Sequence, residues 1–430
     1  MVEKNYKLGI DVGNKLVKIF GDEMEKPLLY PSSLVRYLDV SYLFDNNIEY
    51  LENNDFEIFS LEEDMKESCY IWGRNLYKLG NSIIDTKGAN KLRYENQLYR
   101  KLFLFSVAKY VDNLPNLDTK DKVVLSIAMG MPDEEYASIA NNKFDSIKWM
   151  IGKHIVYVDN LPIEFEIKNV GVVPQEFGSI ILYDKLNGGI TPDVRTLVVD
   201  YGGVTRLRDI YDGFQQRIVS QDTLGLHVLI DKIVDKLKIE GIKNSRRNNQ
   251  NTIEEMLISR NYKMKTGVNS VKDLTVIFRN EINNYVKERF EEDLASGETN
   301  DNLDLLILTG GGANILDKSI YSKLSNEVWI PENPETANVR GFYEYLKIKS
   351  LEDNNKQEEK DKILFNIGDK VKISEMAMEE TNGYNLIPHR NWEGKIIKIL
   401  NKKNEPDVYT VEYPTGEKNL YVSENDLIKI

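Results

Sequence analysis

Three glycine-containing turns, each following a buried strand, constrain the fold of this chain more than any other feature. The first lies in YKLGIDVGNKLVK (residues 6–18), the second in TLVVDYGGVT (196–205) and the third in DLLILTGGGAN (304–314). A short glycine pattern on its own is weak, because such patterns also occur in ordinary turns. Their order along the chain predicts two related α/β halves that close on one nucleotide.

Composition bounds the class of protein. A chain of 430 residues is too long for one ordinary core, which predicts two or three domains. The formal net charge of −13 argues against broad binding to DNA or to anionic membranes. Cys69 is the only cysteine, so no intrachain disulfide can form and a cytoplasmic location is expected. No apolar run reaches the roughly 18 residues that span a bilayer, and the N-terminus resembles no signal peptide.

Alternating strand and helix patterns predict α/β layers in two lobes. Lobe I is expected at residues 1–187, with a polar, irregular insert at about 31–95, and lobe II at 188–349, with a helical insert at about 215–295. Within them, the patterns predict a helix over 96–112, a buried strand over 122–132, a strand pair over 154–174, and helices over 175–186 and 338–349.

The C-terminal part of the chain has a different pattern. Residues 350–362 are charged and nearly free of apolar side chains, which predicts a linker. Residues 363–430 contain short alternating strands separated by turns, which predicts a small all-β, SH3-like barrel. Its slight acidic excess disfavours nucleic acid. Its aromatic residues are expected in the barrel core more often than in a peptide groove: Tyr384, Trp392, Tyr409, Tyr413 and Tyr421.

The first turn has the chemistry of a phosphate site. Asp11 ends a buried strand, where α/β sheets place ligands, and Gly13 lets the backbone approach a phosphate closely. A carboxylate here would hold Mg²⁺ most naturally through water, because magnesium keeps much of its hydration shell. Lys15 and Lys18 are candidate positive partners whose faces the pattern does not decide. An ordinary hairpin remains the alternative interpretation.

The second and third turns extend this interpretation. Asp200, Gly202, Gly203 and Thr205 repeat the first arrangement, so Asp11 and Asp200 would flank one metal. Gly310, Gly311 and Gly312 follow a buried strand and fit a turn that packs on a nucleoside, with no side chain in the way. A tight structural turn without a ligand is again the alternative.

Taken together, these segments resemble a known family. They match the layout of the actin/Hsp70/sugar-kinase superfamily, and in detail its bacterial plasmid-segregating actins of the ParM/StbA type, over roughly residues 1–349. The resemblance rests on the segments IDVGNKLVK, AMGMP, VVPQEFGS, VVDYGGVT, LTGGGAN and PETANVRGFY. The last of them carries the Ala-Asn-x-x-Gly pattern that such proteins have in their final helix.

The resemblance implies a Mg²⁺-dependent ATPase (or GTPase) that polymerises with bound nucleotide and separates plasmid DNA. Its partners would be other copies of itself and a DNA-binding adaptor of ParR type, without direct contact to nucleic acid or membrane. It further implies that Gly13, Asn14, Lys15, Gly202, Gly203 and Thr205 line the phosphates, that Lys18 lies near them, and that Gly310 to Gly312 contact the nucleoside. A small-molecule kinase of the superfamily and a non-segregating actin-like scaffold are the alternatives.

The resemblance also implies a residue that positions the attacking water at the start of the connecting helix. Gln175 and Glu176 are adjoining candidates, and the small residues after them favour Gln175. In two respects the chain departs from the family. The acidic residue expected soon after the second glycine pair comes late, as Asp209, and the C-terminal barrel is an addition. His154, His227 and His389 lack metal-ligand spacing and are interpreted as structural.

Overall fold

The chain forms two compact units, Met1–Lys347 and Ile348–Ile430. The structure is a computed structural model. It describes residues 2–43, 53, 55–63, 66–85, 96–118, 121–138, 144–242, 250–267, 270–295, 303–316, 318–325, 327–361, 367–368, 370–373, 394–400, 408–412, 418–423 and 427–429. The basic segment 243–249, Tyr384, His389, Trp392 and Tyr413 therefore lie outside the described residues.

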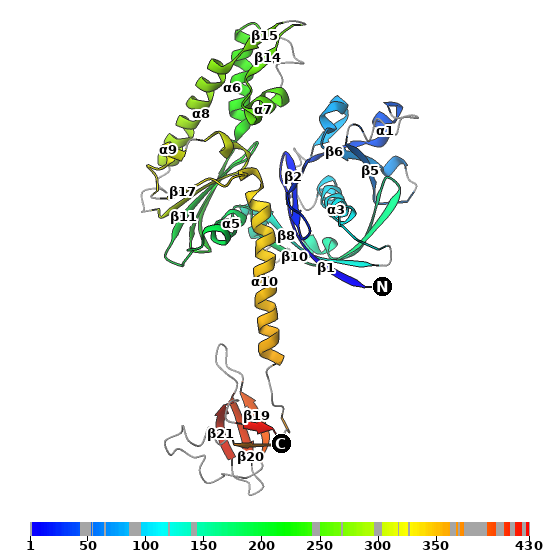
Figure 1. Cartoon of the computed structure of the whole chain (residues 1–430), viewed down its shortest axis with the longest axis vertical. Helices are drawn as coiled ribbons and strands as arrows, with labels where there is room; N and C mark the ends of the chain where they lie inside the picture. The colour runs from blue at the N-terminus through cyan, green and yellow to red at the C-terminus, as the bar shows by residue number, and fades with distance from the viewer. Residues whose placement is uncertain are drawn as a thin grey trace. The chain divides into compact units, whose positions relative to one another are not determined.

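A ten-stranded sheet organises the first half of the first unit (Figure 1). Its strand order is β3-β2-β1-β8-β10-β9-β5-β6-β4-β7. Its central strands β1 (Glu3–Val12), β8 (Lys122–Met131) and β10 (Leu161–Pro174) run parallel. β2 (Leu16–Gly21) folds back antiparallel on β1, and β9 (Gly152–Val158) pairs antiparallel with β10. The helix α3 (Gln97–Asp112) belongs to the main core of this sheet and is buried on all sides from Leu102 to Val111.

The segment predicted as a polar, irregular insert contains more order than its composition indicates. Among the described residues it holds β4 (Ser33–Arg36), β5 (Phe56–Ser60), β6 (Tyr70–Gly73) and β7 (Ile83–Asp85), together with the short helices α1 (Tyr37–Val40), η1 (Ser41–Leu43), η2 (Lys66–Ser68) and η3 (Leu76–Ser82). The strands extend the first sheet because a few apolar side chains, such as Val35 and Ile71, are fully buried between them. The strand β3 (Leu28–Pro31), which comes before this segment in the chain, pairs antiparallel with β2.

A five-stranded sheet organises the second half of this unit. Its order is β13-β12-β11-β16-β17, built from β11 (Arg195–Tyr201), β12 (Arg206–Asp212), β13 (Gln215–Asp222), β16 (Leu305–Thr309) and β17 (Glu327–Trp329). β13 pairs with β12, so residues 215–222 are not part of the helical insert that the sequence predicts from about 215. The first helix begins only at Leu226.

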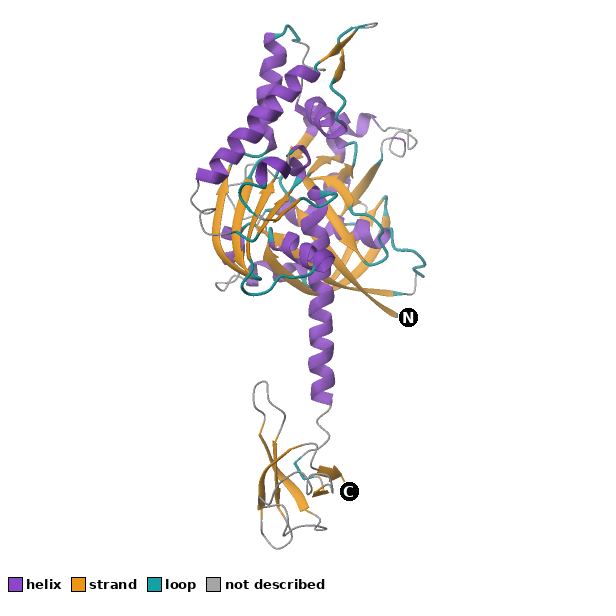
Figure 2. Cartoon of the chain, turned by 60° about the vertical axis from the view of Figure 1, so that its left-hand side comes forward, coloured by secondary structure: helices purple, strands orange, loops and turns teal. Residues whose placement is uncertain are grey.

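The rest of the segment predicted as a helical insert contains a group of three helices. These are α6 (Leu226–Ile239), α7 (Gln250–Ser259) and α8 (Thr275–Ala295), which share one apolar core with the second sheet. A two-stranded hairpin of β14 (Lys263–Lys265) and β15 (Val271–Asp273), which the sequence did not predict, lies at the tip of the group (Figures 1 and 2).

Two helices cross between the sheets at a contact that only glycine allows. These are α5 (Phe177–Asn187) and the start of α10 (Ala337–Asp361). A Cβ added at Gly341 would overlap the carbonyl oxygen of Gly178, and one added at Gly178 would overlap that of Asn338. The remaining short elements are α4 (Asp133–Ser138), η6 (Phe144–Met150), η7 (Gly311–Ile315), α9 (Lys318–Tyr321) and η8 (Pro334–Thr336).

The charged segment predicted as a linker is helical as far as Asp361. α10 continues through it to Asp361, so the helix that was expected to end at 349 runs on. The reason lies in its composition, because Leu, Glu, Lys and Gln are good helix formers even where no core is available to them. A lack of apolar residues indicates that this segment has no core of its own, but it does not exclude a helix.

The second unit contains a five-stranded antiparallel sheet in the order β21-β20-β19-β18-β22. Its strands are β18 (Lys370–Ile373), β19 (Gly394–Leu400), β20 (Val408–Glu412), β21 (Lys418–Ser423) and β22 (Leu427–Lys429), with Tyr409 in β20 and Tyr421 in β21. Within the described residues no pairing joins β21 to β22, so closure into an SH3-like barrel stays a prediction.

Across the described part of the chain, no helix is both long and apolar enough to cross a membrane.

Candidate functional site

The three glycine turns meet at one cleft between the two sheets of the first unit. A cavity of about 100 Å³ lies there. Its lining residues are Gly13, Asn14, Lys15, Leu16, Lys18, Gln175, Asp200, Gly202, Gly203, Val204, Thr205, Leu226, Gly310, Gly311, Gly312, Glu254 and Glu335. The structure therefore brings the predicted phosphate and nucleoside residues together around one cavity. Asp11 does not line the cavity, and its carboxylate is paired with Lys18, which does. Glu176 does not line the cavity.

The first turn positions Asp11 and Lys18 by strand register. The amide of Gly13 donates a 3.0 Å hydrogen bond to the carbonyl of Leu16, which closes the turn between β1 and β2. The register then sets Asp11 opposite Lys18, and the Lys18 Nζ donates to the Asp11 Oδ2 at 2.7 Å. Burial alone would lower the pKa of the Lys18 ammonium, but the carboxylates of Asp11 and Asp200 outweigh it and raise that pKa. Lys18 therefore stays charged beside the cavity.

The second and third turns pack against each other at neighbouring strand ends. β11 and β16 run parallel with Asp200 opposite Thr309, so the turns after them begin at the same sheet edge. Gly310 has a φ of 82°, and a Cβ at this position would overlap the carboxylate of Asp200. The turn therefore requires glycine for its backbone conformation and for space.

Asp200 is held by a hydrogen-bonded chain that reaches into both crossing helices. Its Oδ2 accepts from the Asn338 Nδ2 at 2.8 Å and from the Gln175 Nε2 at 3.3 Å. The Ser179 hydroxyl donates to the Asn338 Oδ1 at 2.5 Å, which orients that amide. Burial raises the pKa of the Asp200 carboxyl, and the nearby Lys18 opposes this shift. Asn338 is not among the predicted site residues, although it lies in the Ala-Asn-x-x-Gly pattern of the sequence.

The two adjoining candidates for positioning water point to different places. Gln175 lines the cleft, and its backbone N–H is fixed by a 3.0 Å hydrogen bond to the carbonyl of Met131. Glu176 is the N-cap residue of α5 and is completely buried, with its carboxylate close to those of Asp133 and Asp209. Glu176 therefore cannot reach a ligand in the cleft without leaving its buried position.

An ion pair spans the mouth of the cleft. The Lys15 Nζ, from the first turn, lies 2.8 Å from the Glu254 Oε2 on α7, and both side chains are about a quarter exposed. The stem of Lys15 lies over Gly203, where an added Cβ would be 2.5 Å from the Lys15 Cδ. The cavity of about 100 Å³ is smaller than the ~300 Å³ of ordinary ligand pockets, so the cleft must widen to admit a nucleotide.

Several other lining residues carry no local signal that would mark them as site residues. Glu254 lies in a charged helical stretch without a recognisable motif, and Glu335 lies just before α10. Leu16, Val204 and Leu226 supply apolar walls next to the first and second turns. Their roles depend on contacts between segments far apart in the chain, which composition does not reveal.

The residues present fit a magnesium nucleotide. Asp200 lines the cleft with a carboxylate, the ligand type that Mg²⁺ prefers, while Asp11 is engaged by Lys18 and could act on the ion only through water. Backbone N–H groups of such turns bind phosphate oxygens well, although those of Gly13 and Gly310 already donate to the carbonyls of Leu16 and Pro334. Lys15 and Lys18 add positive charge on the same side.

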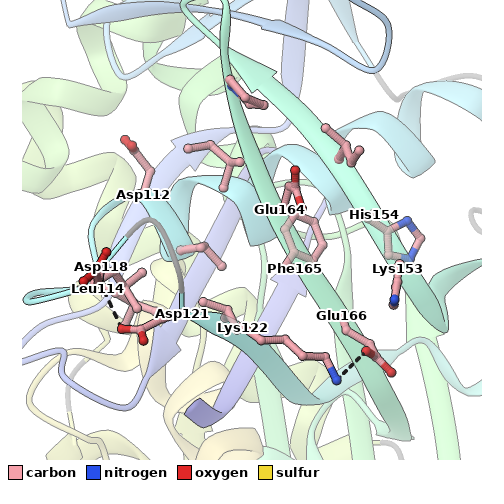
Figure 3. A pocket seen from close by; sticks show the side chains of 16 residues that line it. Asp112, Leu114, Asp118, Asp121, Lys122, Lys153, His154, Glu164, Phe165 and Glu166 are labelled. Carbon is pink, nitrogen blue, oxygen red and sulfur yellow. Dashed lines mark hydrogen bonds and ion pairs between the residues drawn. The ribbon is translucent and has the colours of Figure 1, made fainter. Parts of the chain in front are cut away.

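A larger groove lies elsewhere, on the first lobe (Figure 3). It has a volume of about 730 Å³ and runs between the end of α3, the start of β8 and the strands β9 and β10. Within it, the Lys122 ammonium pairs with the Glu166 carboxylate at 3.0 Å. His154 lines it and stacks on Phe165. None of the glycine turns reaches this groove, so it is not the candidate site.

The first unit has the α/β actin-like fold, seen in solved structures that match it at low identity. No protein-family model matches the chain, and no curated protein matches it.

Three solved structures illustrate the likeness. The apo ParM protein of psk41 is 21% identical, with a TM-score of 0.61 over 81% of this chain and 98% of that one. An archaeal actin homologue in complex with ADP is 15% identical, with a TM-score of 0.61 over 81% of this chain and 100% of that one. A ParM from a 15-stranded filament of Clostridium botulinum is 19% identical, with a TM-score of 0.58 over 81% and 100%.

Proposed function

We propose that this protein is an actin-like ATPase that forms filaments when nucleotide is bound and segregates plasmid DNA through a DNA-bound adaptor of ParR type. The observation that carries the proposal is the meeting of the three glycine turns, Asp200 and Gln175 at one cleft between two sheets. The actin-like fold supports it, as do the ADP complex and the filament among the similar structures. The net charge of −13 suits a protein that reaches DNA through an adaptor.

The residues of the cleft divide the work of phosphoryl transfer. The turns at Gly13 and at Gly202–Gly203 bind the phosphates through backbone N–H groups, and Gly310 to Gly312 pack against the nucleoside. Bound Mg²⁺, held by Asp200 and through water by Asp11, would neutralise charge on the phosphate oxygens. Gln175 orients the attacking water, since in-line transfer needs mainly positioning and charge stabilisation. Asn338 donates a hydrogen bond to Asp200 and so fixes the carboxylate that would hold the metal and that accepts from Gln175.

The test is right-angle light scattering of the purified full chain with Mg²⁺ and ATP, GTP, ADP or no nucleotide, followed by electron microscopy of the same samples. We expect scattering that rises with triphosphate and decays as phosphate is released. Nucleotide binding without a polymer under any condition would overturn the filament proposal and favour a small-molecule kinase. A polymer that binds no DNA-bound adaptor would instead indicate a non-segregating scaffold.

The ion pair across the cleft predicts an effect on nucleotide exchange. In Glu254→Gln, Lys15 loses its partner on α7, so the cleft opens more readily and nucleotide enters and leaves faster. A partly exposed ion pair contributes roughly 0.2–1 kcal/mol, which corresponds to a change of about 1.4- to fivefold. Stopped-flow fluorescence with a labelled nucleotide measures both rates.

The neighbouring Glu255 provides the matched control for that experiment. It lies one position further along α7 and is exposed, and Glu255→Gln makes the same charge change. Exchange rates that are equal in the two variants would show that the Lys15–Glu254 pair does not hold the cleft closed.

The second unit is expected to decorate the filament, by contacts between protofilaments or with the adaptor. Removing residues 351–430 should leave nucleotide binding unchanged, because the cleft belongs wholly to the first unit. Electron microscopy and adaptor co-sedimentation of the truncated chain provide the readout. Unchanged filament form together with unchanged adaptor binding would contradict a role for this unit.

A further inference from the structure

A second group of acidic side chains lies inside the first unit, outside the nucleotide cleft. Asp133 begins α4 directly after β8, Glu176 precedes α5, and Asp209 lies on β12. One carboxylate oxygen from each residue lies within 4.8 Å of the other two. The cluster therefore joins the first sheet, the second sheet and the connecting helix at a single point.

The cluster has few groups that could compensate its charge. Glu176 and Asp209 are both 0% exposed. Neither oxygen of Glu176 has a hydrogen-bond donor among the described residues, and neither does the Asp209 Oδ1. The Gln216 Nε2 donates at 2.6 Å to both Asp133 and Asp209, and the Tyr211 hydroxyl donates to Asp209 at 3.2 Å. Within the described part of the chain, no lysine or arginine forms an ion pair with the cluster.

Burial and mutual repulsion make it unfavourable for the three carboxyl groups to be ionised together. Burial, followed by repulsion from the neighbouring carboxylates, raises the pKa of Glu176 well above its usual range and raises that of Asp209 to about 7. Burial also raises the pKa of Asp133. Buried charges persist in proteins when they are paired or coordinate a metal. A cation or protons must therefore complete the cluster.

We propose that Asp133, Glu176 and Asp209 bind an oxygen-preferring divalent cation of the Mg²⁺, Mn²⁺ or Ca²⁺ class, separate from the ion that accompanies the nucleotide. Such ions hold oxygen ligands at about 2.0–2.6 Å, so two ligands of one ion lie at most about 4–5 Å apart. The spacing within the cluster meets this limit. The amide of Gln216 can turn its oxygen toward the ion, since the two amide orientations differ only in which atom faces the carboxylates.

The position of the site suggests what the ion would do. Its ligands would come from the residue after β8, from β12 and from the residue before α5. A bound ion would therefore restrain the two sheets relative to each other. Glu176 belongs to the cluster, while its neighbour Gln175 lines the cleft. Occupancy by a cation would therefore restrain the backbone that carries the proposed water-positioning residue.

The experiment uses the full chain, stripped of nucleotide and metal, so that the site is tested independently of ATPase activity. Mn²⁺ is titrated and followed by electron paramagnetic resonance and by isothermal calorimetry, with competition by Mg²⁺ and Ca²⁺. We expect one Mn²⁺ per wild-type chain. Glu176→Gln and Asp209→Asn, which keep side-chain size but remove one charged ligand, should weaken Mn²⁺ binding at least about tenfold.

Two further variants locate the bound ion. Asp200→Asn alters the nucleotide cleft and should leave Mn²⁺ binding at the cluster intact. Asp212→Asn makes the same change at the end of β12, where Asp212 pairs with Arg217, and should also bind normally. Binding that is lost in Asp200→Asn but kept in Glu176→Gln would overturn the proposal, because the ion would then lie in the cleft.

The wild-type titration tests whether the cluster binds a cation even if a cluster variant fails to fold. A wild-type chain that binds no Mn²⁺ at millimolar concentration, and whose melting temperature does not rise with Mn²⁺, Mg²⁺ or Ca²⁺, would show that the cluster holds protons only. Circular dichroism of each variant confirms its fold before titration.

Discussion

Replacing Gln175 with alanine is expected to lower ATP hydrolysis about a hundredfold while filaments still form. The side chain lines the cleft and donates to Asp200, but it does not contribute to a core, so its loss removes a positioning group and little stability. Misplacing a reacting group by about 1 Å can cost that factor. Single-turnover phosphate release from preformed filaments measures the rate. The filaments should also persist longer, because hydrolysis is the step proposed to destabilise them.

Glu176→Gln is the matched comparison for this prediction. The glutamate is buried beside Asp133 and Asp209 and does not face the cleft, so hydrolysis should fall much less than in Gln175→Ala. If the glutamate variant lost more activity than the glutamine variant, the assignment of the water-positioning role would be wrong and Glu176 would take it.

Replacing Gly341 with alanine is expected to lower the free energy of unfolding of the first unit by about 3 kcal/mol, the upper part of the range for overpacked interiors. The added methyl group would overlap the carbonyl oxygen of Gly178, where α10 crosses α5. Because the overlap is with backbone, neither helix can relieve it by changing a rotamer. Alanine improves helix propensity by about 1 kcal/mol, which offsets only part of this cost.

Thermal unfolding followed by circular dichroism tests the glycine prediction, with Gly171→Ala as its control. Gly171 lies in β10, where an added Cβ would be 3.5 Å from the Tyr345 ring, an ordinary contact. The Gly341 variant should melt several degrees below wild type and the Gly171 variant close to it. Equal melting temperatures would show that the two helices can separate without cost.

Local signals in the sequence predicted the elements that build the site. The β1–β2, β11–β12 and β16 turns were found from buried strands that end in Asp-x-Gly or in a glycine run, because each is specified within about ten residues. The strand pair of β9 and β10 and the helix α5 were found in the same way, from their apolar spacing. The actin-like arrangement followed from the order of these motifs.

Predictions failed where composition was used in place of pattern. Residues 31–95 look irregular because polar residues dominate, yet a few buried side chains such as Phe56 and Ile71 suffice to add strands to the sheet. Residues 350–361 look like a linker because apolar residues are rare, yet α10 continues through them. Low hydrophobicity indicates that a segment lacks a core, and it does not decide the backbone conformation.

The sequence by itself determined the turns, the strands that precede them and the residue types able to bind phosphate and magnesium. Only the tertiary structure decided which side chains meet. It separated Gln175 from Glu176, paired Lys15 with Glu254 on a helix 239 residues away, and set Asn338 against Asp200. The physical reason is that turns and strands form from neighbouring residues, whereas these contacts depend on how two sheets and two crossing helices pack.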